Sequence, residues 1–265
     1  MKLELKEFKP PYFIHSDIVN AHCILLSQGK IDKKINICEN HFNFLKNTLG
    51  EKNLIFPSFN YKFGENLEFD LLKDESEVGS LTEWVRKNSR FYRSLTPFFS
   101  ILTKDKFIDF REYQNPFNKN SFFDKFFNMG GTFLFYGVNF SIFTAIHYLE
   151  TILGPVPYRY EKVFKGKIID KNNYINCEVT MHVRPRDSGI EYDWDKMQND
   201  LIDEGILKIS KNFRNLYFCR SRDIFNFFKK KLLKDIFYML DKESRENFFS
   251  STNAGKKKVS INDFE

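Results

Sequence analysis

The sequence predicts an α/β fold of the layered type, an α/β/α sandwich in a single domain that spans residues 1–249. Apolar strand-like runs alternate with amphipathic helical stretches up to Pro155, a pattern that places helices against a sheet. Beyond it, apolar runs at 158–169 and 174–183 are joined by a polar turn and predict a hairpin. With 265 residues, 42% of them hydrophobic, the chain is long enough to bury a core.

The first elements are a strand and two helices. Residues 12–15 form a short apolar run that predicts a strand. Ser16 and Asp17 follow, and both are residue types that cap the N-terminus of a helix. Apolar residues at helical spacing predict a further helix over residues 32–49, which Gly50 ends.

The next passage combines a strand, a long loop and a helix. Residues 54–59 read as a buried strand that ends or bends at its proline. Residues 60–79 lack a sustained period and predict a long loop, which in a compact domain is often functional. A helix is predicted over residues 80–88, where Ser80 and Glu83 have the spacing of a capping box.

The second half of the chain continues the alternation. A helix over residues 121–129 is closed by Gly130, and a strand follows at 132–138. After the hairpin, the patterns predict helices at 194–203 and 220–240 and a mobile tail at 250–265.

Composition limits the classes of partner. The net charge of +6 and the pI near 8.9 suit an anionic ligand, but without a basic stripe they do not indicate nucleic acid. The four cysteines lack metal-ligand spacing, so we expect reduced thiols and no metal site. No signal peptide and no apolar run of membrane-spanning length is found, which favours a soluble, cytoplasmic protein. The sequence is compatible with a homodimer and does not determine the oligomeric state.

The helix that follows the 132–138 strand carries the most informative pair of residues. His147 and Glu150 are three positions apart and share one helix face, so the carboxylate can orient the imidazole. A histidine placed in this way suits general-base chemistry. The alternative is a histidine in a surface ion pair, and this pair of residues taken alone favours that alternative.

Four separated segments carry a family resemblance. They are FIHSD at 13–17, FPSFNY at 56–61 with its continuation to Glu83, RSLTPFFS at 93–100, and GGTFLFYGVNFSIFTAIHYLE at 130–150 followed by YRY at 158–160. In order and spacing this set resembles the aminoglycoside 3-N-acetyltransferase family over roughly residues 10–195. It is most similar to the members found in bacterial surface-polysaccharide gene clusters. The resemblance implies an α/β sandwich and acyl transfer from acetyl-CoA to an amine on a sugar ring.

The resemblance also implies roles for individual residues. His147 corresponds to the catalytic base of the family's H-x-x-E segment and Glu150 to its companion acid. Asp70 corresponds to an acid on the amine-binding side. Two positions depart from the family: Thr96 stands where many members have histidine, and Phe143 stands where the aminoglycoside enzymes carry asparagine. These changes indicate a different acceptor pocket.

Further assignments complete the expected site. Thr144 is a candidate donor to the oxyanion, with a structural helix threonine as the alternative. The expected CoA contacts come from His15 and Ser16, where a strand gives way to a helix, and from Arg93 and Ser94, with a plain N-cap and a core ion pair as alternatives. Sugar contacts are expected from Asp70, Tyr158 and Arg159, with structural roles as alternatives.

Three functions compete at this point. We expect an acetyl-CoA-dependent N-acetyltransferase that acts on an amino sugar, preferably a nucleotide-linked one, by direct transfer without a covalent acyl-enzyme. No cysteine lies near a histidine in the sequence and no nucleophile elbow is present, which argues against a covalent route. The alternatives are an antibiotic 3-N-acetyltransferase and a catalytically silent sugar-binding relative.

Overall fold

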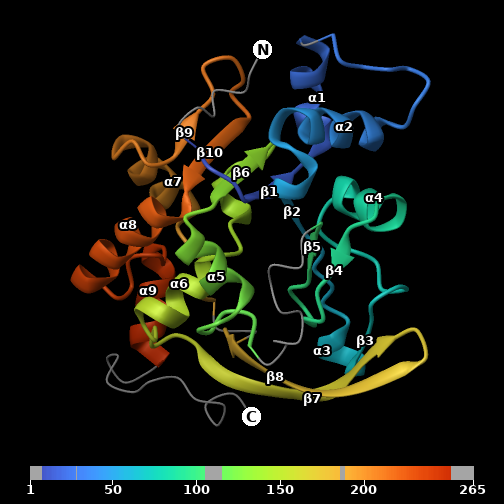
Figure 1. The fold of residues 1–265 in the computed structure, drawn as a ribbon. Helices are drawn as coiled ribbons and strands as arrows, with labels where there is room; N and C mark the ends of the chain where they lie inside the picture. The colour runs from blue at the N-terminus through green and yellow to red at the C-terminus, as the bar shows by residue number, and fades with distance from the viewer. Residues whose placement is uncertain (1–7, 28, 105–114, 186–188, 252–265) are drawn as a thin grey trace.

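The computed structural model describes residues 8–27, 29–104, 115–185 and 189–251. A seven-stranded sheet lies between two groups of helices, and a separate three-stranded sheet crosses one end of the molecule (Figure 1). The predicted layered α/β/α sandwich is therefore confirmed. The second sheet is an addition to it, built on the predicted hairpin.

The centre of the large sheet consists of three parallel strands. β1 (Tyr12–Ser16) lies between β2 (Leu54–Pro57) and β6 (Thr132–Tyr136), and all three were predicted from their apolar runs. Antiparallel strands extend both edges, in the order β4-β5-β2-β1-β6-β10-β9. These outer strands, which the sequence did not predict, are β4 (Tyr92–Arg93), β5 (Ile101–Thr103), β9 (Lys208–Ile209) and β10 (Leu216–Arg220).

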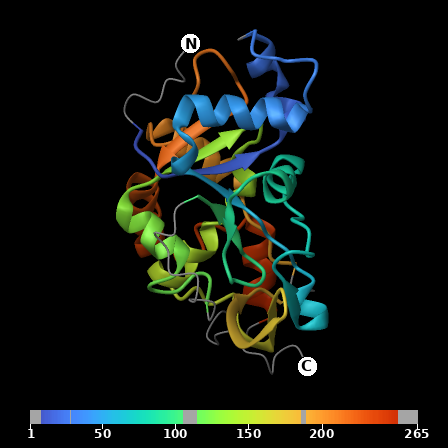
Figure 2. The same cartoon turned by 45° about the vertical axis from the view of Figure 1, so that its right-hand side comes forward.

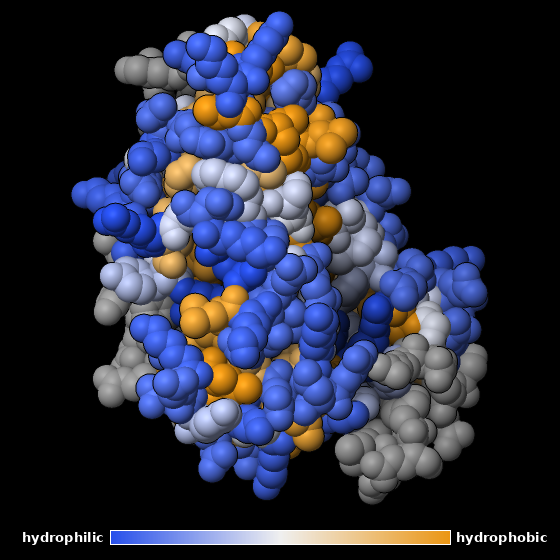
Figure 3. Space-filling model, turned by 90° about the vertical axis from the view of Figure 1, so that its right-hand side faces the viewer, coloured by the Kyte–Doolittle hydropathy of each residue, from blue (hydrophilic) through white to orange (hydrophobic). Residues whose placement is uncertain are grey.

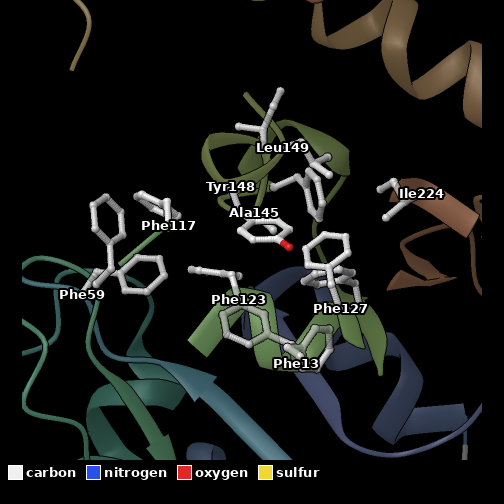
Figure 4. Close-up of a cluster of buried hydrophobic side chains, with 14 of the residues drawn as sticks. Phe13, Phe59, Phe117, Phe123, Phe127, Ala145, Tyr148, Leu149 and Ile224 are labelled. Atoms are coloured by element: carbon white, nitrogen blue, oxygen red, sulfur yellow. The ribbon is translucent and has the colours of Figure 1, made fainter. Parts of the chain in front are cut away.

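Alternation along β1 divides the core between the two faces of the sheet. Tyr12 and Ile14 pack with α1 (Ile18–Ser27), α2 (Ile37–Leu49) and α4 (Ser80–Asn88) on one face. Phe13 packs on the other face with α5 (Phe122–Met129), α6 (Ile146–Leu153), α7 (Trp194–Asp203) and α8 (Ser221–Lys234). Figure 2 shows the helices on either side of the strands. In Figure 4, Phe13, Phe123 and Phe127 gather opposite Tyr148 of α6.

Local side-chain hydrogen bonds decide where the first helices begin. The Asp17 carboxylate accepts from the Val19 amide at 2.9 Å, so Asp17 caps α1 as predicted. The predicted helix over 32–49 begins five residues late, because the Asn36 side chain caps α2 by accepting from the Cys38 amide at 2.7 Å.

The predicted capping box of α4 is wrong. Gly79 is the N-cap and makes no side-chain hydrogen bond. Glu83 instead accepts from the Ser76 amide at 2.7 Å and pairs with Arg86 at 2.7 Å, so it ties the helix to the preceding loop. That loop also contains two short elements that the sequence did not predict, α3 (Phe63–Asn66) and β3 (Glu68–Asp70).

The three-stranded sheet consists of β3 and the predicted hairpin. β7 (Tyr160–Asp170) and β8 (Asn173–Val183) pair along their whole length, and β3 adds in parallel to β7. Gly166 lies at the crossing, where a Cβ would come within 2.2 Å of the Leu67 carbonyl oxygen. The hairpin backbone therefore touches the α3–β3 segment directly.

The C-terminal region departs from the predicted boundaries. The helix predicted over 220–240 ends at Lys234, and α9 (Lys242–Ser251) follows. Two residues of the predicted tail belong to α9, and the rest of it, 252–265, lies outside the described residues. The short 3-10 turns η1 (Glu51–Asn53) and η2 (Phe140–Ile142) complete the elements.

The surface is mainly hydrophilic on the face shown in Figure 3, where apolar side chains gather in small groups. Exposed apolar residues such as Leu72, which is 58% exposed, are ordinary on the surface of a folded protein. Within the described ranges, no helix combines the length and apolar character that a membrane crossing requires.

Candidate active site

The predicted catalytic pair lies in the first turns of α6, just beyond the end of β6. After β6 the backbone passes close to the start of α1. Gly137, at this point, has a φ of +80°, and a Cβ there would come within 2.1 Å of the Asp17 carbonyl oxygen, so only glycine fits. The Asn139 side chain then accepts from the Ser141 amide and starts η2. α6 follows and carries His147 in its first turn and Glu150 one turn later.

Glu150 is the centre of a buried polar cluster. Its side chain has no exposed surface. One carboxylate oxygen, Oε1, accepts from the hydroxyls of Tyr158 at 3.0 Å and Tyr192 at 2.7 Å. The other, Oε2, lies 3.2 Å from Nδ1 of His147 and 2.7 Å from Nε of Arg159. Four side chains from three segments of the chain thus converge on one carboxylate.

The cluster fixes the charge of both predicted catalytic residues. Burial alone would raise the pKa of Glu150, but Arg159 and the donors on its oxygens outweigh burial and lower that pKa to about 2. Burial lowers the pKa of His147 below its ordinary 6.5, and the charge of Arg159 lowers it further, against the opposite effect of Glu150. At neutral pH the pair is therefore a carboxylate and an uncharged imidazole.

Aromatic rings surround the imidazole. The ring centroids of Phe117, Phe99 and Tyr192 lie 5.3, 6.3 and 6.4 Å from that of His147. The His147 side chain keeps 27% of its surface exposed, whereas its partner Glu150 keeps none. The imidazole can therefore reach a ligand while its carboxylate is shielded from water, which is the arrangement that a general base requires.

Two residues for which sugar contacts were predicted belong to this cluster. Tyr158 is fully buried and Arg159 is 6% exposed, and both point their polar groups at Glu150. Arg159 also donates to the carbonyl oxygen of His182 at 3.0 Å. In this structure both side chains bind Glu150, and their contact with a sugar stays a prediction.

Tyr192 is a site residue that the sequence did not reveal. Its hydroxyl donates to Glu150, accepts from Nη2 of Arg159 and lies 3.5 Å from Nδ1 of His147. The residue is 42 positions from Glu150 and lies in no regular element, so no periodicity or motif indicated it. Only the fold brings it to the cluster.

The predicted CoA-binding residues His15 and Ser16 lie at the carboxyl end of β1, in the middle of the large sheet. His15 is 3% exposed and stacks on Phe135 at 5.3 Å. Its Nε2 and the Ser16 hydroxyl are both buried and have no hydrogen-bond partner among the described residues. A Cβ on Gly79 would come within 3.2 Å of the Ser16 carbonyl oxygen. These two orphaned polar atoms fit a ligand that supplies hydrogen bonds.

Arg93 and Ser94 hold the scaffold together. The guanidinium of Arg93 donates to Ser100 at 3.0 Å and to the carbonyl oxygens of Ser58, Asp74 and Leu71. The Ser94 hydroxyl accepts from the Ile101 amide at 3.0 Å and is buried. The core ion pair considered for Arg93 is replaced by carbonyl contacts, and a phosphate would have to break those contacts to bind this arginine.

Asp70 and Thr144 make only local contacts in this structure. Asp70 accepts from the Leu72 amide at 2.9 Å and the Lys73 amide at 3.0 Å, which lowers the pKa of its carboxyl against the opposing effect of burial. The Thr144 hydroxyl donates weakly to the Ile142 carbonyl oxygen at 3.4 Å. Beyond these hydrogen bonds, the charge of Asp70 acts on Arg93. The roles assigned to Asp70 and Thr144 stay predictions.

One further histidine and three of the four cysteines are buried. His41 is buried and its Nδ1 lies 2.8 Å from the hydroxyl of Tyr136, on the face of the sheet opposite α6. Of the four free cysteines, three are buried and Cys23 is exposed. No group of three or more potential metal ligands occurs among the residues that the structure describes.

Comparison with known proteins assigns the family. The family model of aminoglycoside 3-N-acetyltransferases matches residues 45–233. Among solved structures, aminoglycoside acetyltransferase AAC(3)-IVa as apoenzyme is 16% identical with a TM-score of 0.65, covering 95% of this chain and 92% of that one. AAC-IIIb, described as a binary complex with CoASH, is 14% identical with a TM-score of 0.70 over 88% and 92%.

YokD from Bacillus subtilis is 14% identical with a TM-score of 0.63 over 84% of this chain and 87% of that one. At these identities the solved structures establish the fold. No curated protein matches the sequence significantly.

Proposed function

The chain belongs to the aminoglycoside 3-N-acetyltransferase family, and we propose from this premise that it transfers an acetyl group from acetyl-CoA to the single amine of a nucleotide-linked amino sugar, with His147 as general base. As a member of this family, the chain is a CoA-dependent N-acyltransferase. The choice of base and of acceptor is our proposal. The observation that carries it is a partly exposed imidazole held against a fully buried carboxylate.

Acetyl-CoA supplies the thioester, and the carboxyl end of β1 is our proposed place for its polar groups. The orphaned Nε2 of His15 and hydroxyl of Ser16 are the groups that would bind it there. The following helix, α1, presents its N-terminus at the same end of the strand, where anionic groups are favoured. Arg93 is excluded from this proposal because carbonyl oxygens occupy its guanidinium.

His147 performs the proton transfer. An amine on a sugar is largely ammonium at neutral pH, so one proton must leave before its nitrogen can attack the thioester carbonyl. Nδ1 of His147 faces Glu150, and Nε2 is the atom that takes the proton. The C–N bond then forms, the C–S bond breaks, and CoA leaves as the thiol. The hydroxyl of Thr144, just before α6, is our candidate donor to the oxyanion.

The acceptor proposal follows from the charges around the imidazole. The charged groups that lower the pKa of His147 are both cations, Arg159 and Arg184. Arg184 is 31% exposed and lies 5.7 Å from the centre of the Tyr192 ring, so it borders the aromatic surroundings of His147. Glu150 is buried and already paired with Arg159, and the exposed Glu191 pairs with Arg184 at 3.3 Å. A diphosphate could replace Glu191 as the partner of Arg184, whereas a polycationic antibiotic would find Glu191 as the exposed acid beside that arginine.

An aminoglycoside antibiotic is the second candidate acceptor. The family description and the description of AAC(3)-IVa both refer to that activity in other proteins. Asp70, with its carboxylate in a local turn, is the acid that would then serve the ammonium groups. A catalytically silent sugar-binding role has less support, because a silent protein would have no need for a buried carboxylate oriented on a partly exposed histidine.

The proposal is tested in two steps. Acetyl-CoA at millimolar concentration should raise the melting temperature, as linkage requires of a ligand of the folded state. CoA release should then be assayed with a panel of nucleotide-linked amino sugars and aminoglycosides. We expect the highest kcat/KM on a nucleotide-linked substrate, and a higher KM for that substrate in Arg184→Gln. A higher kcat/KM on an aminoglycoside than on every nucleotide sugar would overturn the acceptor assignment.

A further inference from the structure

Nδ1 of His147 has three polar neighbours, the Tyr192 hydroxyl at 3.5 Å and two closer groups that make opposite demands on its proton. The balance between the two closer groups decides whether His147 can act as a base. Oε2 of Glu150 lies 3.2 Å from Nδ1 and can only accept, so this contact requires a proton on Nδ1. Nη2 of Arg159 also lies 3.2 Å from Nδ1 and can only donate, so that contact requires a lone pair there. The two contacts call for opposite tautomers of the uncharged ring.

The tautomer determines the chemistry. With its proton on Nδ1, the ring presents the Nε2 lone pair to a ligand and can take a proton. With its proton on Nε2, the ring presents an N–H to a ligand and is no base. The Glu150 contact therefore favours the competent form and the Arg159 contact favours the incompetent one.

The Tyr192 hydroxyl is placed to resolve this competition. It accepts a hydrogen bond from Nη2 of Arg159, which is the same nitrogen that approaches His147. It donates its own proton to Oε1 of Glu150 at 2.7 Å. One hydroxyl thus accepts from one of the two N–H groups of Nη2, in competition with Nδ1, and holds the carboxylate that Nδ1 must meet.

We propose that Tyr192 is a positioning residue that sets the tautomer of His147, keeping its proton on Nδ1 by engaging Nη2 of Arg159. The expected effect of Tyr192 on the rate rests on the proposed function, in which His147 is the base. The expected effect of Tyr192 on the tautomer does not, because the tautomer is measured in the protein without substrate.

Tyr158 provides a matched control. Its hydroxyl also donates to Oε1 of Glu150, at 3.0 Å, and its ring is fully buried. Among the described residues, Nη2 of Arg159 donates to the Tyr192 hydroxyl and makes no hydrogen bond with that of Tyr158. Tyr192→Phe and Tyr158→Phe therefore each remove one donor from the same carboxylate oxygen, but only the first releases the guanidinium toward His147.

The test reads the tautomer directly. In protein labelled with nitrogen-15 at histidine, the Nδ1 and Nε2 shifts of His147 at neutral pH distinguish a protonated from an unprotonated ring nitrogen. We expect the Nδ1–H form in the wild type, a shift toward the Nε2–H form in Tyr192→Phe, and the wild-type form in Tyr158→Phe. In parallel, kcat of Tyr192→Phe should fall about tenfold or more while KM changes less, since a misoriented base loses part of a contribution of about 10²–10⁴.

Several outcomes overturn the proposal. An Nε2–H form in the wild type does so without any variant, so the test does not depend on a variant that folds. Equal tautomer shifts in the two variants, or none in Tyr192→Phe, also overturn it. If the tautomers behave as expected but Tyr192→Phe keeps the wild-type kcat, Tyr192 still sets the tautomer and the failure lies with His147 as base, which separates the two ideas.

Discussion

At the scale of single residues, the catalytic assignment makes a prediction about His147. His147→Asn should lower kcat by about 10²–10⁴-fold, the usual contribution of a general base. His22→Asn, a histidine on α1 at the other face of the sheet, is the control and should stay within about twofold. If His147→Asn keeps more than about a tenth of the wild-type rate, another group takes the proton.

The pH profile offers an independent check of the same residue. A general base works only while it is unprotonated, and burial with Arg159 lowers the pKa of His147 below its ordinary 6.5. The wild-type kcat should therefore stay constant as the pH falls from neutral to 6.5 and decline only below that value. A decline centred above 6.5 would show that Glu150 dominates over Arg159 and that the imidazole is held as a cation.

Glu150 carries a prediction about stability. Glu150→Gln leaves Arg159 buried without its counter-charge and should lower the free energy of unfolding at neutral pH by about 3–5 kcal/mol. The folded-state pKa of Glu150 is lowered from 4.5 to about 2, so the pairing contributes fully above pH 4.5 and is lost as the pH falls toward 2. The difference between wild type and variant in urea unfolding should shrink over that range.

The control for this prediction is Glu178→Gln. Glu178 is 57% exposed and pairs with Lys165 on the hairpin surface, so its loss should change the free energy of unfolding by less than about 0.5 kcal/mol. Equal losses in the two variants would mean that the buried cluster is not a special source of stability. An activity of Glu150→Gln between those of wild type and His147→Asn is expected, because the carboxylate acts through the imidazole.

Part of this site could be read from the sequence, and part could not. His147 and Glu150 are three positions apart on one helix, so their contact follows from helix geometry. The contacts of Tyr158 and Arg159 with Glu150 could not be predicted, because sequence cannot tell whether a side chain after a proline turn faces solvent or the core. Tyr192 was missed because only the tertiary fold brings it to Glu150.

At the scale of elements, boundaries were predictable where a local cap sets them. Ser121 and Gly130 enclose α5 as predicted, because the Ser121 hydroxyl accepts from the Asp124 amide and Gly130 takes a left-handed conformation. The edge strands β4 and β9 have only two residues each, which is too short for an alternating pattern. Their pairing with longer neighbours creates them, and that pairing is a property of the whole sheet.

The hairpin makes a prediction at the same scale. Gly166→Ala would place a Cβ 2.2 Å from the Leu67 carbonyl oxygen and 2.8 Å from the Phe63 ring, so β7 must move away from the α3–β3 segment. We expect a loss of about 1–3 kcal/mol in the free energy of unfolding, measured in urea. Lys165→Ala, one residue away with a side chain that is 77% exposed, should be close to neutral. An unchanged stability of Gly166→Ala would mean that the hairpin can shift freely.

At the scale of the whole molecule, charge is the property that composition states most directly. A net charge of +6 attracts anionic substrates to the protein surface as well as to the site. Raising the ionic strength from about 0.1 to about 1 M shortens the Debye length from about 10 to about 3 Å. KM for acetyl-CoA should therefore rise severalfold while kcat changes little. A salt-independent KM would mean that the phosphates of CoA are bound by buried neutral groups.

The fold class was predictable from the pattern of apolar residues along the chain. Apolar strands that alternate with helical stretches require helices on both faces of the sheet. Phe13 and Ile14 on opposite faces of β1 are both buried, so both faces of the sheet are covered. The separate three-stranded sheet was not predictable, since nothing in the apolar run of 158–169 says which sheet it joins. Its parallel contact with β3 depends on the path of a segment that looked like a loop.

The buried pairing of Glu150 with Arg159 also limits how this enzyme can diverge in evolution. Replacing either residue alone leaves an unpaired buried charge, at a cost on the order of 3–5 kcal/mol, against a total stability of about 5–15 kcal/mol for a typical domain. Lineages can cross that barrier only by exchanging both residues together. Arg184 and Glu191 on the rim, 31% and 68% exposed, carry no such penalty. New acceptors are therefore most accessible through drift at the rim, with the proton-handling machinery inherited unchanged.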